Sequence, residues 1–477
     1  MNSSFAYLPQ NERKKILLIC DDIRVHSGVA TVARELVLNT AQHFNWVNVG
    51  GAINHPEQGK RLDLSPDTNT NTGLTDASVI LYPTNGYGDA NLIRQLISIE
   101  KPDAIFLITD PRYFTWVFQM ENEIRRKIPI VYLNIWDDIP APMYNKEFYE
   151  SCDALLAISK QTLNINKMVL GNKAKNKVIK YVPHGLNHNI FKPVEESNSE
   201  LQQFKKQMLK DLNPEFTLLF NSRNIRRKQI PDALLAFRLF LDKLPKEKAN
   251  KCTFLLHTQP VDDNGTDLNA IIEYLFDEYP NAIRFTNGML DTDKMNLLYN
   301  LADATILLTS NEGWGLSLTE SLLCGKMIIA NVTGGMQDQM RFEKEGKWID
   351  FTPDFPSNHK GTVKDHGKWV LPVYPTNMSI QGSVPTPYIF DDRCSPEDAA
   401  ARIMEVYNMS KEERIEKGLA GREWAVGEEA GFTGEMMGKR SINAIDELFD
   451  NWQPREEFEL LSDSDYEKRV LPHKLVY

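Results

Sequence analysis

Short apolar runs alternate with amphipathic segments along most of the first 190 residues. The runs are suited to buried strands and lie at 15–21, 46–49, 79–82, 104–109, 130–134, 154–159 and 178–182. Segments with helical spacing lie between several of them, among them 29–44, 91–100 and 115–127. Regular alternation of strand and helix predicts a mainly parallel sheet with helices on both faces.

A second series of the same kind follows the segment 181–193, whose glycine and prolines mark a chain that turns and crosses. Its strand-like runs lie at 216–221, 252–258, 304–309 and 326–330, and its helix-like segments include 231–244, 291–299 and 316–323. The two series predict an α/β protein with two Rossmann-like, doubly wound domains. We place the domains at 1–190 and 191–440, and a C-terminal helix and tail at 441–477.

The composition agrees with folded α/β domains. The chain has 477 residues, of which 42% are hydrophobic and 25% are charged. It has no apolar run suited to crossing a membrane and no signal pattern at its start. Five scattered cysteines predict reduced thiols and a cytoplasmic location. The net charge of -11 argues against general nucleic-acid binding, although a local basic groove is compatible with it.

The stretch 310–325 holds the densest candidate chemistry. Glu312 and Glu320 are separated by seven residues that include two glycines, between a predicted strand and a predicted helix. Glycine permits close backbone approach to a ligand, and the amides that open a helix carry positive partial charge. Such amides suit sugar or phosphate oxygens, and the carboxylates suit hydroxyl groups. On the spacing alone, a strand–turn–helix with solvated glutamates explains the pattern equally well.

This stretch resembles the donor-sugar motif of family-4 retaining glycosyltransferases, which have the GT-B fold. That motif is a Glu, a Gly–aromatic–Gly run, a second Glu, a small residue, an apolar pair and Cys-Gly or Ala-Gly, and the chain has each in order. The resemblance covers most of 14–340. It implies two domains facing across a cleft, the first for the acceptor and the second for a nucleotide-diphosphate sugar, UDP- or GDP-linked. It implies transfer to an acceptor hydroxyl with retained configuration, without a metal or another cofactor.

The resemblance also assigns roles to single residues. Glu320 would hold the donor ribose, and Glu312 would contact the donor sugar. The residues that would present amides to the donor are Gly313, Trp314, Gly315 and Leu316. Arg223 and Lys228 match an Arg–x4–Lys pair whose charges would stabilise the departing diphosphate. Gly28 matches a glycine of the family's first loop, near the diphosphate or the acceptor.

Purely structural explanations, which involve no ligand, exist for these assignments. The segment 222–229 could be a solvated basic turn, which is how we interpret Arg226 and Arg227. Gly28 could simply belong to a tight turn. Acceptor residues are expected where strands of the first domain end. The candidates are Asp110, Arg112, Trp136, Asp137 and Asp138, with His184 from the crossing segment.

The family has a His–Asp pair where this chain has Trp136–Asp137, which is a departure at the usual histidine contact. Action of Asp137 or Asp138 on the acceptor hydroxyl and helix capping by an aspartate explain these residues equally well. For His184, a structural role is slightly favoured over a catalytic one.

The acceptor class is open. The first loop, the segment 136–138 and a long insert at 341–392 resemble a virus-encoded subgroup, some of which glycosylate hydroxylated cytosine in DNA, and which would work in the host cytoplasm. A basic strip would then bind DNA phosphates, although a solvated helix and turn explains it slightly better: Lys167, Lys173, Lys175, Lys177 and Lys180. Otherwise the acceptor is a glycan, a lipid-linked sugar or a small metabolite.

Two further questions concern the rest of the chain. The insert could be a lid or acceptor platform, and packing as an extra hairpin is the favoured interpretation. The helix that starts near Gly434 is a candidate to cross back onto the first domain. A glycoside phosphorylase and a non-catalytic nucleotide-sugar-binding protein are the alternatives to a transferase, and the oligomeric state is not predicted.

Overall fold

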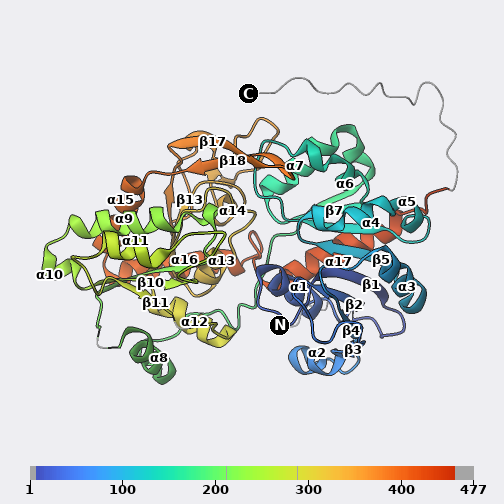
Figure 1. Ribbon diagram of the computed structural model, residues 1–477, viewed down its shortest axis with the longest axis horizontal. Helices are drawn as coiled ribbons and strands as arrows, with labels where there is room; N and C mark the ends of the chain where they lie inside the picture. The colour runs from blue at the N-terminus through green and yellow to red at the C-terminus, as the bar shows by residue number, and fades with distance from the viewer. Residues whose placement is uncertain (1–6, 211, 287, 457–477) are drawn as a thin grey trace.

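The protein is described here by a computed structural model that defines residues 7–210, 212–286 and 288–456 (Figure 1). Two α/β lobes lie side by side, one formed by the first part of the chain and the other by most of the remainder. Within the defined residues, no helix combines the length and the apolar character that a membrane span needs. The start of the predicted N-terminal domain, up to residue 6, and the predicted tail from residue 457 lie outside the described residues.

The first lobe contains an eight-stranded sheet in the order β3-β4-β2-β1-β5-β6-β7-β8. Its strands are β1 (Lys14–Asp21), β2 (Phe44–Gly51), β3 (Leu62–Asp63), β4 (Val79–Pro83), β5 (Ala104–Ile108), β6 (Ile130–Asn134), β7 (Ala154–Ala157) and β8 (Val178–Tyr181). Every neighbouring pair is parallel except β3–β4. The strand order reverses between β1 and β5, and ligands of doubly wound sheets bind at such a switch point.

The helices of this lobe follow the predicted alternation. They are α1 (Gly28–Leu38), α2 (Ser65–Thr72), α3 (Ala90–Glu100), α4 (Thr115–Gln119), α5 (Glu121–Ile124), α6 (Lys146–Glu150) and α7 (Lys160–Leu170), with 3-10 turns η1 (Pro111–Phe114), η2 (Met143–Asn145) and η3 (Gly171–Asn176). The first helix ends at Leu38 and not near residue 44, because Phe44 already pairs with Lys14 in the sheet.

The central strand β1 is buried on both faces. Ile16 and Leu18 belong to one hydrophobic cluster, on one side of the sheet. Leu17 and Ile19 belong to the other cluster. Successive side chains of a strand point to opposite faces, so a continuous apolar run is what a strand covered by helices on both sides requires.

The second lobe contains a six-stranded parallel sheet in the order β11-β10-β9-β12-β13-β16. Its strands are β9 (Phe216–Asn221), β10 (Cys252–His257), β11 (Ile283–Phe285), β12 (Ala304–Leu307), β13 (Met327–Asn331) and β16 (Val370–Val373). Its helices are α8 (Ser199–Leu209), α9 (Ile230–Asp242), α10 (Lys246–Ala249), α11 (Leu268–Leu275), α12 (Thr292–Leu301), α13 (Leu316–Leu323), α14 (Met336–Met340), α15 (Pro396–Asn408) and α16 (Lys411–Val426), with the 3-10 turn η4 (Arg226–Lys228). The prediction of two Rossmann-like parallel-sheet domains is confirmed.

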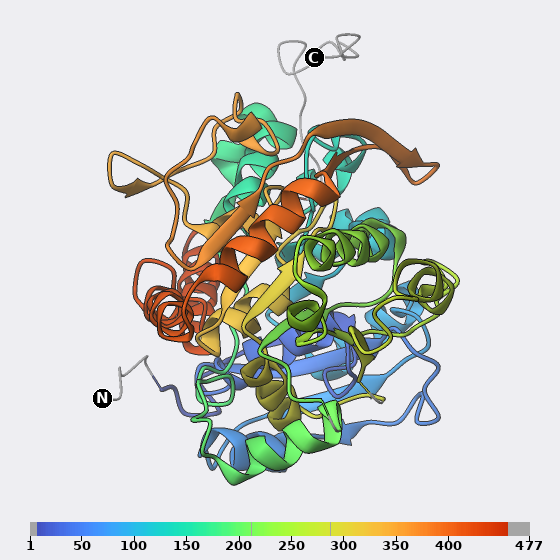
Figure 2. The same ribbon diagram turned by 90° about the vertical axis from the view of Figure 1, so that its left-hand side faces the viewer.

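The insert at 341–392 contains several elements. They are β14 (Glu343–Lys344), β15 (Lys347–Trp348), η5 (His359–Gly361), the sheet strand β16, β17 (Asn377–Ser383) and β18 (Thr386–Arg393). The β17–β18 hairpin extends from the second lobe along the top of the molecule (Figure 2). Its second strand hydrogen bonds with both lobes: the Phe390 amide donates to Ile139 at 3.0 Å, and the Asp392 amide donates to Ser310 at 2.8 Å.

The last described helix, α17 (Gly434–Asn451), returns to the first lobe and packs against α1, β7 and β8 (Figure 1). Glycine makes the close approach possible, since a Cβ on Gly438 would lie 2.6 Å from the carbonyl oxygen of Asn39. The return segment also runs beside the first crossing, because Leu186 forms a parallel bridge with Thr433. The two lobes are therefore joined by two adjacent crossings.

Candidate active site

The two candidate carboxylates lie where β12 ends and α13 begins. The loop from Thr309 to Gly315 is buried throughout. Gly315 has a φ of 85°, in the left-handed region that favours glycine, and it immediately precedes Leu316, the first residue of α13. The glycine therefore lets the buried loop turn sharply into the helix.

Glu312 is held by two cations from η4. Lys228 contacts Oε2 of Glu312 through its Nζ, and Arg227 donates from Nη1 to the same oxygen at 3.0 Å. Burial by itself would raise the pKa of Glu312, but the charges of Arg227 and Lys228 outweigh burial and lower it to about 2. Burial lowers the pKa of Lys228, and Glu312 opposes that effect. The result is an ionised carboxylate between two cations.

Arg227 is a site residue that the sequence interpretation missed. The interpretation of Arg227 as part of a solvated turn is wrong, because its side chain is only 33% exposed and pairs with Glu312. Its Nη1 also donates to the Asn311 carbonyl at 2.7 Å, and its own carbonyl accepts from the Ser310 amide at 2.9 Å. The 3-10 turn η4 directs Arg227 and Lys228 toward one carboxylate, which their sequence positions do not reveal.

Arg223, the other predicted cation, lies differently. Its side chain is 63% exposed, and its Nε donates to Asp262 at 2.9 Å. The structure therefore does not bring Arg223 into contact with Glu312. Its contact with a donor diphosphate stays a prediction.

Glu320 has neutral partners. The Tyr299 hydroxyl donates to its Oε2 at 2.5 Å, and Asn221 donates from Nδ2 to the same oxygen at 3.2 Å. Burial raises the pKa of Glu320 to about 7, although these two hydrogen bonds favour the ionised form. Tyr299 and Asn221 lie in α12 and at the end of β9, so no local motif could have indicated them.

The side chain of Trp314 belongs to the core. It is 2% exposed, and its Nε1 donates to the Thr319 hydroxyl at 2.9 Å. Its ring meets the edge of Phe432 at 4.8 Å and lies 6.1 Å from the ring of His184. Trp314 therefore anchors the motif to the crossing segments, and its side chain has a packing role.

Glycines allow the loop from Thr309 to Gly315, hereafter called the donor loop, to pack closely against the first lobe. A Cβ on Gly313 would lie 2.6 Å from the carbonyl oxygen of Ile135 and 3.2 Å from Oδ1 of Asp137. A Cβ on Gly28 would lie 3.5 Å from the side chain of Leu316. The predicted first-loop glycine and the predicted donor motif are thus brought together.

Asp137 and Asp138, the two aspartates predicted near the acceptor, differ in how deeply they are buried. Asp137 is partly exposed beside the donor loop, and burial raises its pKa while Arg227 opposes the rise. Asp138 is fully buried, and the Thr333 hydroxyl lies 2.7 Å from its Oδ2 and equally close to Oδ2 of Asp392. Burial, and after it the charge of Asp392, raise the pKa of Asp138 well above the ordinary value. The alternative of helix capping is wrong, because the next helical element, η2, has no side-chain cap.

The other acceptor candidates lie at the carboxyl edge of the first sheet or are buried behind that edge. Trp136 is 7% exposed and donates from Nε1 to the Asp138 carbonyl at 2.8 Å, so its ring has a packing role. His184 is buried, which lowers its pKa to about 3 and keeps it neutral. Arg112 donates from Nε to Asp110 at 2.7 Å and contacts the Thr386 hydroxyl through Nη1. Asp110 and Arg112 therefore connect the end of β5 with the insert.

The insert also contacts the donor loop through Asp391, a residue that the sequence did not single out. Its Oδ1 accepts from the Ser310 hydroxyl at 2.8 Å and from Nδ2 of Asn311 at 2.9 Å. Ser310 and Asn311 directly precede Glu312. The strand β18 thus fixes the chain at the entrance of the donor motif.

The basic strip lies away from these residues. The turn η3 precedes β8 and is therefore at the amino edge of the parallel sheet, whereas Asp137 follows β6 at the carboxyl edge. Lys173 pairs with Glu150 at 3.0 Å, and Lys180 pairs with Glu447 at 2.7 Å. The favoured interpretation of a solvated helix and turn agrees with this position except at Lys177, whose partly buried Nζ donates to the Glu150 carbonyl at 2.8 Å.

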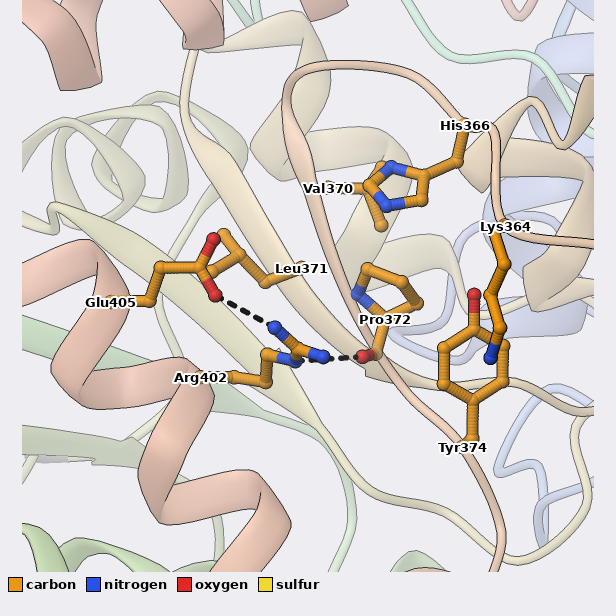
Figure 3. Close-up of a pocket in the computed structure, with 8 residues that line it drawn as sticks. All are labelled: Lys364, His366, Val370, Leu371, Pro372, Tyr374, Arg402 and Glu405. Carbon is orange, nitrogen blue, oxygen red and sulfur yellow. Dashed lines mark hydrogen bonds and ion pairs between the residues drawn. The ribbon is translucent and has the colours of Figure 1, made fainter. Parts of the chain in front are cut away.

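A pocket of about 230 Å³ lies elsewhere, between β16 and α15 (Figure 3). It is lined by Lys364, His366, Val370, Leu371, Pro372, Tyr374, Arg402 and Glu405. Arg402 donates to Glu405 at 2.7 Å and to the Pro372 carbonyl at 3.2 Å. In the described part of the chain, none of these residues hydrogen bonds with Glu312 or Glu320.

Comparisons with known protein families agree with this geometry. The family described as "Glycosyl transferases group 1" matches residues 200–355, about a third of the chain. The matched segment contains η4, both carboxylates and α13. A search of curated proteins gave no match.

Solved structures with the same architecture cover nearly the whole chain. A glycosyltransferase from Rickettsia africae is 15% identical, with a TM-score of 0.62, over 92% of this chain and 100% of its own. HepE from Anabaena, in complex with UDP and glucose, is 13% identical, with a TM-score of 0.61, over 91% and 100%. Sucrose-phosphate synthase from Thermosynechococcus elongatus is 16% identical, with a TM-score of 0.62, over 92% and 100%. The predicted GT-B fold is confirmed, and the family match confirms the prediction of a glycosyltransferase.

Proposed function

We propose that the protein transfers a sugar from a nucleotide-diphosphate donor to an acceptor hydroxyl, with retained anomeric configuration and without a metal ion. The observation that carries the proposal is the buried contact of Glu312 with Arg227 and Lys228. Two fixed cations beside the glycine-rich start of a helix suit a ligand that is anionic and hydroxylated. HepE, which shares the fold, is in complex with UDP and glucose, and this supports a UDP- or GDP-linked donor.

The cations are suited to stabilise the leaving group. Negative charge grows on the diphosphate as the bond from the sugar C1 to the phosphate oxygen breaks. Glu312 holds Arg227 and Lys228 in a fixed arrangement before the donor binds, so little reorganisation is needed when that charge develops. Glu312 itself is a hydrogen-bond acceptor for the donor sugar. Arg223, on the exposed side of the same segment, is proposed as a further contact to the diphosphate.

We propose a front-face path for the transfer. The acceptor oxygen forms a bond to C1 as the bond from C1 to the phosphate oxygen breaks, and that phosphate oxygen takes the proton of the acceptor hydroxyl. Configuration is retained because attack and departure occur on the same face of the sugar. This path assigns no nucleophilic role to Glu312, in agreement with a carboxylate that two cations already engage.

Glu320 suits the ribose of the donor. Both of its hydrogen bonds with Tyr299 and Asn221 use Oε2. Its other oxygen can accept from the ribose hydroxyls. The amides of Gly313, Gly315 and Leu316 are then proposed to approach the sugar or the phosphates.

The acceptor site is proposed at the carboxyl edge of the first sheet. Asp137 lies there beside Gly313 and is the carboxylate best placed to accept from an acceptor hydroxyl. A glycan or small hydroxylated molecule agrees with this site better than modified DNA does, because Lys173, Lys175 and Lys177 precede β8 and therefore lie at the opposite edge of the sheet.

The experiment is nucleoside-diphosphate release from a panel of UDP- and GDP-sugars by the purified protein, with and without EDTA. Acceptors would include glycosides and DNA that contains hydroxymethylcytosine, and NMR of the product would give the anomeric configuration. We expect release with at least one donor, no effect of EDTA and a retained configuration. Donor binding without release for any combination would instead establish a nucleotide-sugar-binding protein.

A further inference from the structure

Two tyrosines form a ring pair at the carboxyl edge of the first sheet. Tyr87 follows β4, and Tyr113 lies in η1, after β5. Their ring centroids are 4.9 Å apart, with an angle of 41° between the planes. Tyr113 is 57% exposed, whereas Tyr87 is partly buried beneath it. An exposed aromatic ring supported by a second ring offers a flat apolar surface to a ligand at little entropic cost.

Hydrogen bonds through Asp21 connect this pair with the loop that contains Gly28. The Tyr87 hydroxyl donates to Oδ1 of Asp21 at 2.8 Å, and the Ser27 hydroxyl donates to Oδ2 at 2.5 Å. The next residue, Gly28, faces Leu316 of the donor motif. The tyrosine pair is therefore held at the switch point between β1 and β5, where a doubly wound sheet binds its ligands.

The backbone that leads to Tyr113 is strained. Thr109, immediately after β5, has a φ of 116°, which a β-branched residue rarely adopts. The Tyr132 hydroxyl donates to its carbonyl oxygen at 3.0 Å and helps to hold this conformation. Backbone strain of this kind concentrates at ligand sites, where the surrounding structure enforces it.

The charges around the pair do not suit an anionic ligand. Carboxylates of Asp21, Asp110 and Asp137 end the neighbouring strands or follow them. The guanidinium beside Tyr113, Arg112, is already engaged by Asp110 at 2.7 Å and by the Thr386 hydroxyl. Carboxylate oxygens accept hydrogen bonds from hydroxyl groups, whereas a phosphate among them would be repelled.

From these contacts we infer that Tyr113 is the stacking residue of the acceptor site, and that the acceptor is an uncharged hydroxylated molecule with an apolar ring face, such as a terminal sugar unit. This inference rests on the proposed function and deepens it. Tyr87 supports the stacking ring, and the carboxylates around it select hydroxyl groups over phosphates.

The test compares three probe acceptors with the donor that gives the fastest release. They are p-nitrophenyl glucoside, which is neutral, glucose 6-phosphate, and DNA that contains hydroxymethylcytosine. We expect the neutral glycoside to accelerate release most. Tyr113→Ala should raise its KM about 3- to 10-fold, as loss of one aromatic contact implies, and Tyr113→Phe should restore it. Binding of UDP to Tyr113→Ala, measured by calorimetry, should match the wild type.

The control is Tyr274→Ala, because Tyr274 is 84% exposed at the other lobe, in α11. It should leave the KM of the glycoside unchanged. Acceleration only by glucose 6-phosphate or by DNA would overturn the inference while the proposed function stands, and so would an unchanged glycoside KM in Tyr113→Ala. If UDP binds and no nucleotide sugar is turned over, the proposed function is wrong and the inference falls with it.

Discussion

Arg227 donates from Nη1 to Oε2 of Glu312 at 3.0 Å across 85 residues of sequence. Lys228 contacts the same oxygen, so one buried carboxylate aligns two consecutive cations. Burying three charged groups costs free energy unless the charges are paired, and these charges are paired. The pairing holds both side chains at the place where we propose that the diphosphate leaves.

Removal of one cation should therefore reduce turnover far more than donor binding. We expect Lys228→Ala and Arg227→Ala each to lower kcat by about 10²–10³, the usual effect of one group that stabilises developing charge. Steady-state kinetics with the best donor would measure it. Arg226→Ala is the matched control, because Arg226 is an exposed neighbour in the same turn. Unchanged turnover in Lys228→Ala would remove Lys228 from the mechanism.

Glu320 should make donor binding depend on pH. Its pKa is raised by burial to about 7, so its carboxylate forms as the pH rises through 7. Because the ionised form accepts hydroxyl groups better, we expect the donor KM to fall between pH 6 and pH 8. Kinetics across this range would show it, and Glu320→Gln should remove the change. A wild-type donor KM that is flat over the range would exclude the ribose role.

The same group should lower the stability of the fold as pH rises. Its folded pKa of about 7 lies above the unfolded value of 4.5, so the native state binds more protons between these values. The wild type should lose stability, by about 1–3 kcal/mol, as pH rises from 4.5 to 7. Denaturant unfolding of wild type and Glu320→Gln at pH 5 and 8 would measure the difference, which should be much smaller at pH 5, just above the unfolded pKa, than at pH 8. An equal difference in unfolding free energy at both pH values would contradict a raised pKa of Glu320.

Asp391 should couple the insert to catalysis. Asp391→Ala removes two hydrogen bonds, from Ser310 and Asn311, and frees the chain directly before Glu312. We expect a loss of about 2–4 kcal/mol in unfolding free energy and a roughly tenfold lower kcat. Asp354→Ala, an exposed aspartate of the same insert, should change neither quantity. A variant with normal kcat would show that β18 has only a packing role.

Gly313 should be intolerant of any side chain. A Cβ there would lie 2.6 Å from the Ile135 carbonyl, so Gly313→Ala must displace the donor loop or separate the lobes. We expect a loss of about 1–3 kcal/mol in stability, with transfer reduced more than donor binding because the acceptor side moves away. Thermal unfolding and small-angle scattering would detect the two effects. Wild-type transfer in Gly313→Ala would mean that the lobes need not approach this closely.

The sequence by itself determined the alternation of strands and helices, the division into two Rossmann-like domains and the strand–loop–helix that contains Glu312 and Glu320. These features are local. Burial on both faces makes β1 a continuous apolar run, and Gly315 is required where the loop enters α13 in the left-handed region. A motif confined to one element is visible in a single stretch of residues.

Only the tertiary structure decided which side chains meet. Arg227 and Arg223 lie in the same basic segment, yet a 3-10 turn directs Arg227 to Glu312 while Arg223 pairs with Asp262. Asp391 reaches Asn311 across 80 residues because the insert folds back onto the donor loop. Asp138 is fully buried, where the Thr333 hydroxyl lies 2.7 Å from Oδ2 of both Asp138 and Asp392, whereas Asp137 stays partly exposed beside Gly313. Such pairings depend on how distant elements pack, and the spacing of residues along the chain carries no record of that packing.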